Sequence, residues 1–327
     1  MKGSLSNIKT SIMKIRTIHL GIILLSNLII SINPIKVSGR HGAGDDQTDQ
    51  SFMLPVRYYQ IAQLYGPGMP RSGTEGLHLD TLDVNSGKVG LVLVHTWNLG
   101  EADGPYPIVD TTTWTDGEAG AWVPEAHKII KENIHPVLKA ARQSGIKVFH
   151  LAQSTYAEKY PQYQELKNDP ELQNPARRVT FEKCIEPVNY QEGWEREYGG
   201  NYPGPVWRTH AEEFDIAGSL KPLPDEYVFV TGWQLNGLCR RENISILIYA
   251  GFMADLCLLN IPGAIREMSN TFQYNCIVLR DCTTAYEYEE TFERKWMTFA
   301  AIRMIETEFG YSASAEEFIN ACQRPNE

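Results

Sequence analysis

The chain has 327 residues, 43% of them hydrophobic and 21% charged, which is typical of a soluble globular protein with one sizeable core or two modest ones. Its 40 acidic residues outnumber its 30 Lys and Arg residues, and the formal net charge is −10. A surface this acidic repels polyanions, so we expect neither nucleic acid nor an anionic membrane as the main partner. Glycine and proline are close to average usage, which excludes collagen-like and low-complexity classes.

Residues 1–39 have the pattern of a secretory signal peptide. They contain no Asp or Glu, and four positive charges precede an apolar run at 18–32, with compact residues at 37–39 that suit cleavage. The run is only about 15 residues long, which is short for a membrane-spanning helix. We therefore expect a secreted or periplasmic protein with no membrane contact after cleavage. The alternative is an uncleaved membrane anchor.

The rest of the chain reads as an extension followed by one folded domain. Residues 40–51 are polar and Gly-containing, so we interpret 40–78 as a linker and N-terminal extension. The folded domain is predicted over 79–322. It contains a long, polar and aromatic-rich insertion at about 153–221, which is a candidate lid or subunit contact.

The cysteines do not form a recognisable metal or disulfide framework. No CxxC pair and no Cys/His pair at zinc spacing occurs, so we expect no metal site and no cofactor. Six cysteines in a chain this long permit disulfides but do not define a scaffold. They are Cys184, Cys239, Cys257, Cys276, Cys282 and Cys322.

Apolar runs alternate with helical patterns throughout the domain, which predicts a parallel sheet covered by helices on both faces. The predicted strands lie at 88–95, 146–152, 227–231, 244–251 and 275–280. The predicted helices lie at 124–144, 234–242, from 257 to about 270, and 289–309. Pro136 must kink or break the first of these helices. Chemistry is expected at the carboxyl ends of the strands.

Cys257 stands out because it follows an apolar strand and begins a predicted helix. Helix N–H groups and the helix dipole would lower the pKa of a thiol at this position and could bind a developing oxyanion. The alternative is that Cys257 is a buried structural cysteine without a functional role, which is the commoner case for a cysteine in an apolar segment.

The segments around this cysteine resemble the isochorismatase-like cysteine hydrolases, which include nicotinamidases and N-carbamoylsarcosine amidohydrolase. The family nucleophile segment reads roughly G-φ-A-T-D-x-C-V, and residues 251–258 read GFMADLCL. Residues 90–95 (GLVLVH) resemble the opening strand, 137–148 the first helix and second strand, and 278–281 (VLRD) the fifth strand. The match extends over most of 79–322.

The resemblance implies a fold and a site. The fold is an α/β three-layer sandwich with a doubly wound, mostly parallel six-stranded sheet. A non-prolyl cis peptide would fall at Phe252–Met253, and the N–H groups of Met253 and Cys257 would form the oxyanion site. Trp97, in the segment after the first strand, and Asp255, in the nucleophile segment, are candidate pocket residues.

Of the family's catalytic Asp, Lys and Cys, only the cysteine is carried over. The Asp position falls on His95, and the Lys position falls on Gly232, or on Thr231 if the register slips by one. The family's metal-binding D-x-H motif is replaced by residues 153–155, which read QST. The family's metal site is therefore expected to be absent.

Two functional hypotheses follow. In the first, the chain is an exported hydrolase of a small amide or related C–N or vinyl-ether bond. Cys257 is its nucleophile and His95 its base, and the two could form a thiolate–imidazolium pair. In the second, the domain binds a small molecule without turnover, and His95 is a satisfied core or rim histidine. Homo-oligomerisation is left open.

Overall fold

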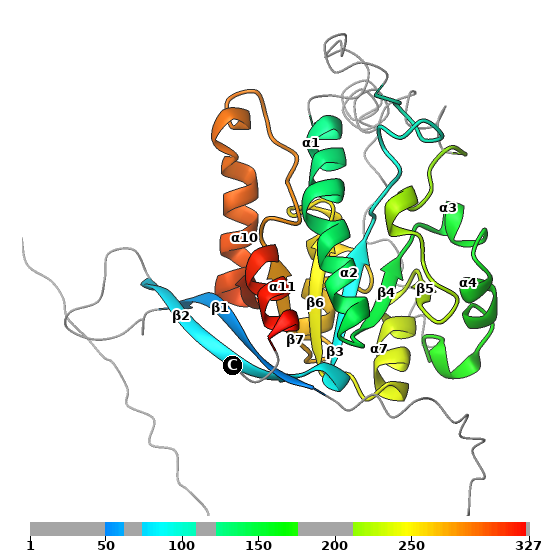
Figure 1. Ribbon diagram of the computed structural model, residues 1–327, viewed down its shortest axis with the longest axis horizontal. Helices are drawn as coiled ribbons and strands as arrows, with labels where there is room; N and C mark the ends of the chain where they lie inside the picture. Colours follow the sequence, from blue (N-terminus) through cyan, green and yellow to red (C-terminus); the bar gives the residue numbers. More distant parts are fainter. Residues whose placement is uncertain (1–49, 62–73, 109–121, 176–211, 325–327) are drawn as a thin grey trace, which may run out of the picture. The chain divides into compact units, whose positions relative to one another are not determined.

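The computed structural model describes residues 50–61, 74–108, 122–175 and 212–324, so the predicted signal peptide lies outside the described residues. Their central feature is one eight-stranded sheet (Figure 1). In sheet order the strands are β2 (Thr74–Asn85), β1 (Ser51–Ile61), β8 (Gly310–Ala313), β7 (Asn275–Leu279), β6 (Ile246–Gly251), β3 (Val89–Val94), β4 (Lys147–Leu151) and β5 (Tyr227–Phe229).

The six strands β3 to β8 pair in parallel, which confirms the predicted α/β fold with a doubly wound, mostly parallel sheet. From β3 the chain moves outward through β4 to β5, and then returns to β6 on the other side of β3. The strand order therefore reverses between β3 and β6. Open α/β sheets bind ligands at the carboxyl edge of such a switch point.

The two remaining strands form a hairpin that extends the sheet. Strand β1 pairs antiparallel with β2 and, at Arg57, with β8. Part of the segment interpreted as an extension, 40–78, thus belongs to the sheet. Its period-2 pattern buries Phe52, Leu54 and Val56 on one face. Pro55 is an unusual strand residue that obscured this pattern in the sequence.

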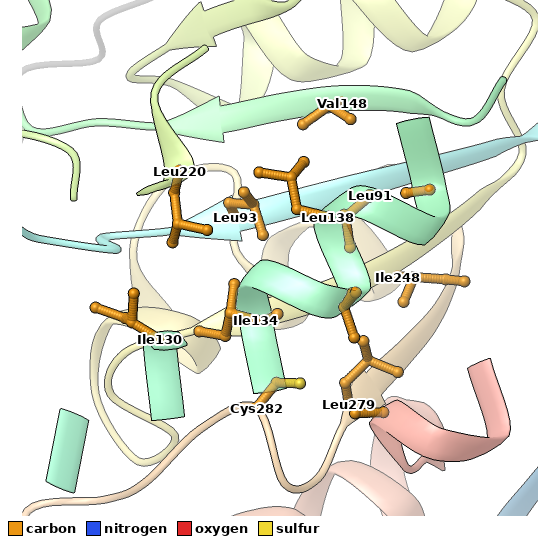
Figure 2. Packing of buried hydrophobic residues seen from close by; sticks show 14 of the residues in the cluster. Leu91, Leu93, Ile130, Ile134, Leu138, Val148, Leu220, Ile248, Leu279 and Cys282 are labelled. Carbon is orange, nitrogen blue, oxygen red and sulfur yellow. The ribbon is translucent and has the colours of Figure 1, made fainter. Parts of the chain in front are cut away.

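Helices cover both faces of the sheet, as the continuous apolar strands require. Leu91 and Leu93 point into the first core and Val92 and Val94 into the second, because successive strand residues face opposite sides. Figure 2 shows the first core. It is covered by α1 (Trp122–Ile129), α2 (His135–Gln143) and α11 (Ala315–Gln323). The second is covered by α7 (Gly232–Arg241), α8 (Cys257–Asn260), α9 (Ile265–Asn270) and α10 (Trp296–Glu308).

Short helices complete the described residues. Two α-helices lie in the predicted insertion, α3 (Ser154–Ala157) and α4 (Pro161–Leu166). The 3-10 turns are Ser86–Lys88, Pro170–Leu172, Gly218–Leu220 and Phe292–Arg294. No helix among the described residues has the length and apolarity needed to cross a bilayer.

The predicted helix at 124–144 exists, and it continues through Pro136 without a break. A π-helical turn, Ile130–Ile134, joins α1 to α2 just before the proline. Proline has no N–H, and its ring collides with the carbonyl four residues earlier, so the helix widens locally instead of breaking. Ile130 and Ile134 still reach the core across this turn.

Two predicted helices have different bounds. The helix predicted at 289–309 begins at Trp296, because Lys295 adopts a left-handed conformation with φ 55°. It is followed by α11, which was not predicted. The helix predicted from 257 to about 270 is divided into α8 and α9, since Pro262 cannot continue a helix and Gly263 turns the chain with φ 86°.

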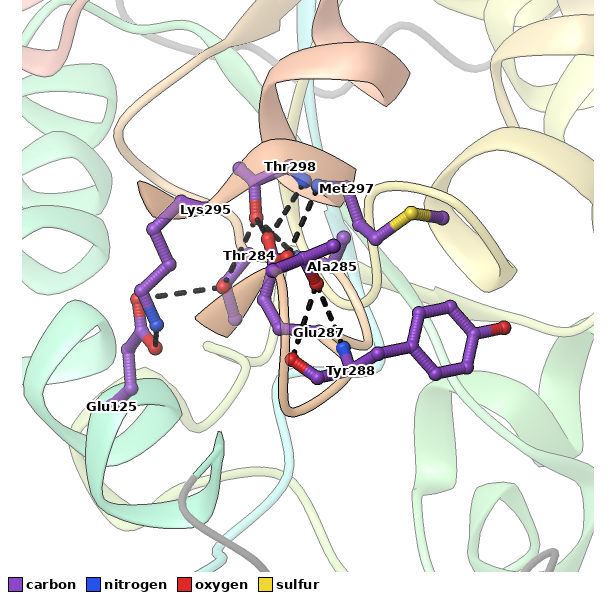
Figure 3. A network of polar contacts seen from close by, with 9 residues as sticks. Glu125, Thr284, Ala285, Glu287, Tyr288, Lys295, Met297 and Thr298 are labelled. Atoms are coloured by element: carbon purple, nitrogen blue, oxygen red, sulfur yellow. Dashed lines mark hydrogen bonds and ion pairs between the residues drawn. The ribbon is translucent and has the colours of Figure 1, made fainter. Parts of the chain in front are cut away.

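The start of α10 is fixed by a polar network (Figure 3). Glu287 accepts hydrogen bonds from the backbone N–H groups of Met297 at 3.0 Å and Thr298 at 2.8 Å. Lys295 forms an ion pair with Glu125 on α1. The loop between β7 and α10 is thereby joined to the first turn of α10 and to α1.

The buried carboxylate of Glu306 joins strand β1 of the hairpin to α10 and β8. Substitution of its partner Arg57 tests this part of the fold. Glu306 on α10 is buried and accepts hydrogen bonds from Arg57 on β1 and Ser312 on β8. We expect Arg57→Met to lower the free energy of unfolding by on the order of 2–3 kcal/mol, because it leaves the carboxylate without its main counter-charge. Urea unfolding measures this loss. Arg57→Met combined with Glu306→Gln should recover part of it, and equal losses in both variants would contradict the prediction.

Candidate active site

A cavity of about 540 Å³ opens at the carboxyl edge of the sheet, beside the switch point. Its described wall is built from the ends of β3, β4 and β5, from both ends of the predicted insertion, and from the residue after α8. The lining residues are His95, Leu151, Ala152, Gln153, Ser154, Thr155, Phe214, Val230, Thr231 and Ile261. Pockets of this size hold small organic molecules.

His95 directly follows β3 and forms part of the cavity wall. Its backbone adopts φ 47°, and its N–H donates to the Leu151 carbonyl at 3.1 Å. The imidazole stacks on the Trp97 indole, with ring centroids 5.0 Å apart, and only 5% of the residue is exposed. Its Nδ1 has no hydrogen-bond partner among the described residues.

Burial keeps the His95 imidazole neutral. Desolvation of the charged form lowers the pKa of His95 to about 3. The position that the family resemblance gives to a carboxylate therefore holds an uncharged imidazole. Such a group can accept a proton during a reaction but does not begin as a cation.

Cys257 lies after β6, at the first residue of α8. The loop that leads to it contains the expected cis peptide bond at Phe252–Met253. A backbone hydrogen bond at Met253 favours the thiolate of Cys257 and lowers its pKa in part. The role of the Met253 and Cys257 N–H groups as oxyanion donors stays a prediction.

The expected activation of the thiol is wrong for this structure. Burial raises the pKa of Cys257 to about 11, and the Asp255 carboxylate adds to the rise, while the Met253 N–H offsets only part of it. Helix α8 is only four residues long, because the chain turns at 261–263, so little helix dipole is present to oppose desolvation. No hydrogen bond joins Cys257 to His95 among the described residues, and their catalytic pairing stays a prediction.

The position that the resemblance gives to the family lysine, Gly232, is closely packed. Gly232 is packed so closely that an added Cβ would lie 1.9 Å from Oε2 of Glu267. That oxygen is held in place by the Gly263 N–H at 2.7 Å. The alternative position, Thr231, lines the cavity and caps α7, its hydroxyl accepting the Gln234 N–H at 3.2 Å.

Residues 153–155, which replace the family's metal-binding motif, lie in the cavity wall. Their amide and hydroxyl groups make the wall polar without charge. Among the described residues, no three His, Cys, Asp or Glu side chains gather as a metal site would require. The five cysteines in this part of the chain are free thiols, and Cys184 lies outside the described residues.

Neither of the two other candidate pocket residues is among the lining residues of the cavity. Trp97 is buried between His95 and Phe214, with ring centroids 6.0 Å from Phe214. Asp255 accepts the Tyr286 N–H at 3.2 Å, which fixes the loop before α10 to the nucleophile segment. Tyr156, which sequence reasoning did not single out, is buried and interacts electrostatically with Cys257.

Alkylation of Cys257 tests its electrostatic environment directly. We expect the rate of its reaction with iodoacetamide to rise continuously from pH 7 to above pH 9, because the buried thiol has a pKa raised to about 11. Intact-mass analysis against pH measures this rate, and Cys257→Ala identifies the modified residue. A plateau of rapid alkylation below pH 8 would contradict the expectation.

A model of the isochorismatase domain matches residues 111–317, which is well over half of the chain. The chain belongs to the isochorismatase family. Proteins of this family are generally hydrolases with a cysteine nucleophile. A comparison of this chain with curated proteins found no match.

Solved structures of similar proteins include three that are named as hydrolases. A cysteine hydrolase from Pseudomonas syringae pv. phaseolicola is 14% identical to this isochorismatase-family chain, with a TM-score of 0.44, covering 73% of this chain and 94% of that one. An N-carbamoylsarcosine amidase from Thermoplasma acidophilum is 15% identical, with a TM-score of 0.36 and coverages of 70% and 97%. A nicotinamidase from Bacillus subtilis is 15% identical, with a TM-score of 0.34 and coverages of 69% and 99%.

Proposed function

We propose that this protein hydrolyses a small amide, or a related C–N or vinyl-ether bond, with Cys257 as the nucleophile and His95 as the proton acceptor. One observation carries the proposal. Cys257 follows β6 and begins α8, the position that the family resemblance gives to the nucleophile, and a backbone hydrogen bond at Met253 offsets part of the rise in its thiol pKa. The cavity that His95 lines supplies room for a substrate.

Because the Cys257 thiol and the His95 imidazole are both neutral near pH 7, the thiol proton must move to His95 during the attack. As the Cys257 sulfur attacks the carbonyl carbon, its proton passes to His95, and the oxyanion accepts hydrogen bonds from the Met253 and Cys257 N–H groups. The imidazolium then protonates the leaving amine, which departs and leaves a thioester on Cys257. Water, deprotonated by His95, hydrolyses this thioester and restores the free thiol.

A second function, ligand binding without turnover, is favoured by the raised pKa of Cys257. A thiol that remains protonated near pH 7 is a weak nucleophile. The cavity, however, would bind a small molecule in either case. The two functions therefore differ in whether a covalent intermediate forms.

The covalent intermediate supplies the test. Wild type and Cys257→Ala are incubated with a panel of small amides, and product is measured together with the intact mass of the protein after rapid acid quenching. We expect product and an acyl adduct on the wild type, and neither on Cys257→Ala. Binding of panel members without product or adduct would favour the non-catalytic function.

We further propose that the protein is exported, on the basis of the charged and apolar segments within residues 1–39. Fractionation of cells that express the full chain tests this. Export predicts a mature protein about 39 residues shorter than the full chain, found outside the cytoplasm. Full-length protein in the membrane fraction would instead favour an uncleaved anchor.

A further inference from the structure

The hairpin ends the sheet with a long strand whose outer side is unprotected. Strand β2 is the longest strand among the described residues, where it pairs with β1 alone (Figure 1). An edge strand presents unpaired N–H and C=O groups, and natural proteins usually protect it with lysine, proline or a bulge. The residues of β2, TEGLHLDTLDVN, include no lysine and no proline, and the one irregularity in its pairing lies at its first residues. The edge is therefore open to pairing with another strand.

Two leucines of β2 face solvent instead of a core. Leu79 is 79% exposed and Leu77 is 46% exposed. They lie opposite Arg57 and Tyr59 of β1, so they share the face of the hairpin that packs on α10. Arg303 of α10 covers the Tyr59 ring, with its guanidinium carbon 3.7 Å from the ring centroid, and the two leucines lie on the next strand outward. Aliphatic side chains this exposed on an open edge indicate a surface that another chain covers.

The sequence of β2 is self-complementary in one register. In a two-fold pair of antiparallel strands, opposite residues must lie on the same face of the sheet, so the axis passes through one residue position. An axis at His78 pairs residues 74–82 of both copies. Leu77 of each copy then lies opposite Leu79 of the other, and the four leucines form one apolar cluster. Glu75 lies opposite Thr81 and Asp80 opposite Gly76, so no carboxylate faces another.

The neighbouring registers are less favourable because of charge. An axis at Leu79 places Glu75 of each copy opposite Asp83 of the other, and an axis at Asp80 places the two Asp80 carboxylates opposite each other. Like charges directly opposite on paired strands are destabilising. An axis at Leu77 pairs only residues 74–80 and places Leu79 opposite Glu75. Charge and apolar burial therefore favour the same register, the one centred on His78.

We propose that the protein forms a two-fold dimer in which the β2 strands of two copies pair antiparallel about His78. The pairing joins the two eight-stranded sheets into one and buries Leu77 and Leu79 of both copies. Neither leucine lines the cavity at the carboxyl edge of the sheet. The dimer is therefore independent of the proposed function, and each stands or falls by its own experiment.

Two lysine substitutions on β2 test the interface. Leu79→Lys places two charges in the leucine cluster, because the symmetric dimer contains each position twice, and should raise the dissociation constant of the dimer about 100-fold or more. The matched control, Thr81→Lys, places the same side chain at an exposed position on the same face, opposite Glu75 of the partner. It should leave the dimer as strong as in the wild type or stronger. Sedimentation velocity of the full chain against concentration measures both, and circular dichroism should show both variants folded.

A cysteine at the axis tests the register. Opposite residues on antiparallel strands have Cα atoms about 4.5–5.5 Å apart, which is within reach of a disulfide. Copper-catalysed oxidation should therefore cross-link His78→Cys into a covalent dimer. In Asp80→Cys the two new thiols would lie four residues apart along the strands, about 13 Å, and should not cross-link. Non-reducing gels compare both variants with the wild type, whose described cysteines are buried or half-buried.

Several results would overturn the proposal. A wild-type protein that remains a monomer up to a concentration of about 1 mM forms no dimer of this kind. Equal weakening by Leu79→Lys and Thr81→Lys, or a dimer that neither weakens, would place the contact elsewhere. Cross-linking of Asp80→Cys but not of His78→Cys would exclude the register. A monomer that binds lipid vesicles as the wild type but not as Leu79→Lys would assign the leucines to a membrane surface instead.

Discussion

Replacement of Cys257 by alanine is expected to lower turnover of an amide substrate by about 10³-fold or more, as removal of a nucleophile does in other hydrolases. The reason is geometric. Among the described cysteines, Cys257 alone is half-buried and begins a helix directly after the loop that follows β6, whereas the others are buried. Steady-state kinetics with a substrate found in the amide panel measures the loss.

Cys322→Ala is the matched control for this substitution. Cys322 is a buried free thiol on α11, which packs against the first core rather than at the cavity. We expect it to leave turnover unchanged and to lower stability slightly, because a small apolar group is removed from a packed site. Comparable losses of turnover in both variants would point to a general effect of thiol removal on folding. Unchanged turnover in Cys257→Ala would exclude this residue as the nucleophile.

Much of the fold was predictable because strong local patterns agreed with it. The five predicted strands correspond to β3 to β7, since each is a largely apolar run that a sheet covered on both faces buries. The resemblance supplied the sixth parallel strand in general terms but not its position. The hairpin was missed because a proline interrupts β1 and because pairing with β8 depends on residues more than 200 positions away.

The candidate site was predictable only in part. Sequence reasoning placed His95 and Cys257 at the same edge of the sheet, because parallel strands end there together. It could not foresee that burial would oppose both charged forms, since the pKa of each group depends on surrounding atoms from distant segments. Phe214 was also missed, because nothing in its polar surroundings distinguishes a wall residue from ordinary packing.

The pKa of His95 predicts a second large effect, on stability in acid. Above pH 6.5 the imidazole is neutral in both the folded and unfolded states and contributes no pH dependence. Between pH 6.5 and about 3 the unfolded chain binds a proton that the folded chain excludes. The free energy of unfolding should therefore fall by about 1.4 kcal/mol for each pH unit in this window. Below pH 3 both states are protonated and the effect is complete.

His95→Asn isolates this contribution. Asparagine tolerates the positive φ of 47° at this position and keeps a polar side chain, but it does not titrate. The buried His150 and the carboxylates titrate equally in both proteins and cancel in the comparison. Urea unfolding at pH 6.5, 5.5 and 4.5 should show the wild type losing stability more steeply than the variant, by about 1.4 kcal/mol per pH unit.

Parallel stability curves for the two proteins would mean that His95 is accessible to protons in the folded state.

The same imidazole is the proposed proton acceptor, so its lowered pKa also affects the pH dependence of turnover. A base that remains neutral to about pH 3 does not switch off near pH 6.5, and turnover should persist to pH 5 in the folded fraction. His95→Asn should lose most turnover at every pH, because the variant has no group to accept the thiol proton. Loss of wild-type turnover with a midpoint near pH 6.5, at full folding, would instead require a protonated and therefore solvated His95.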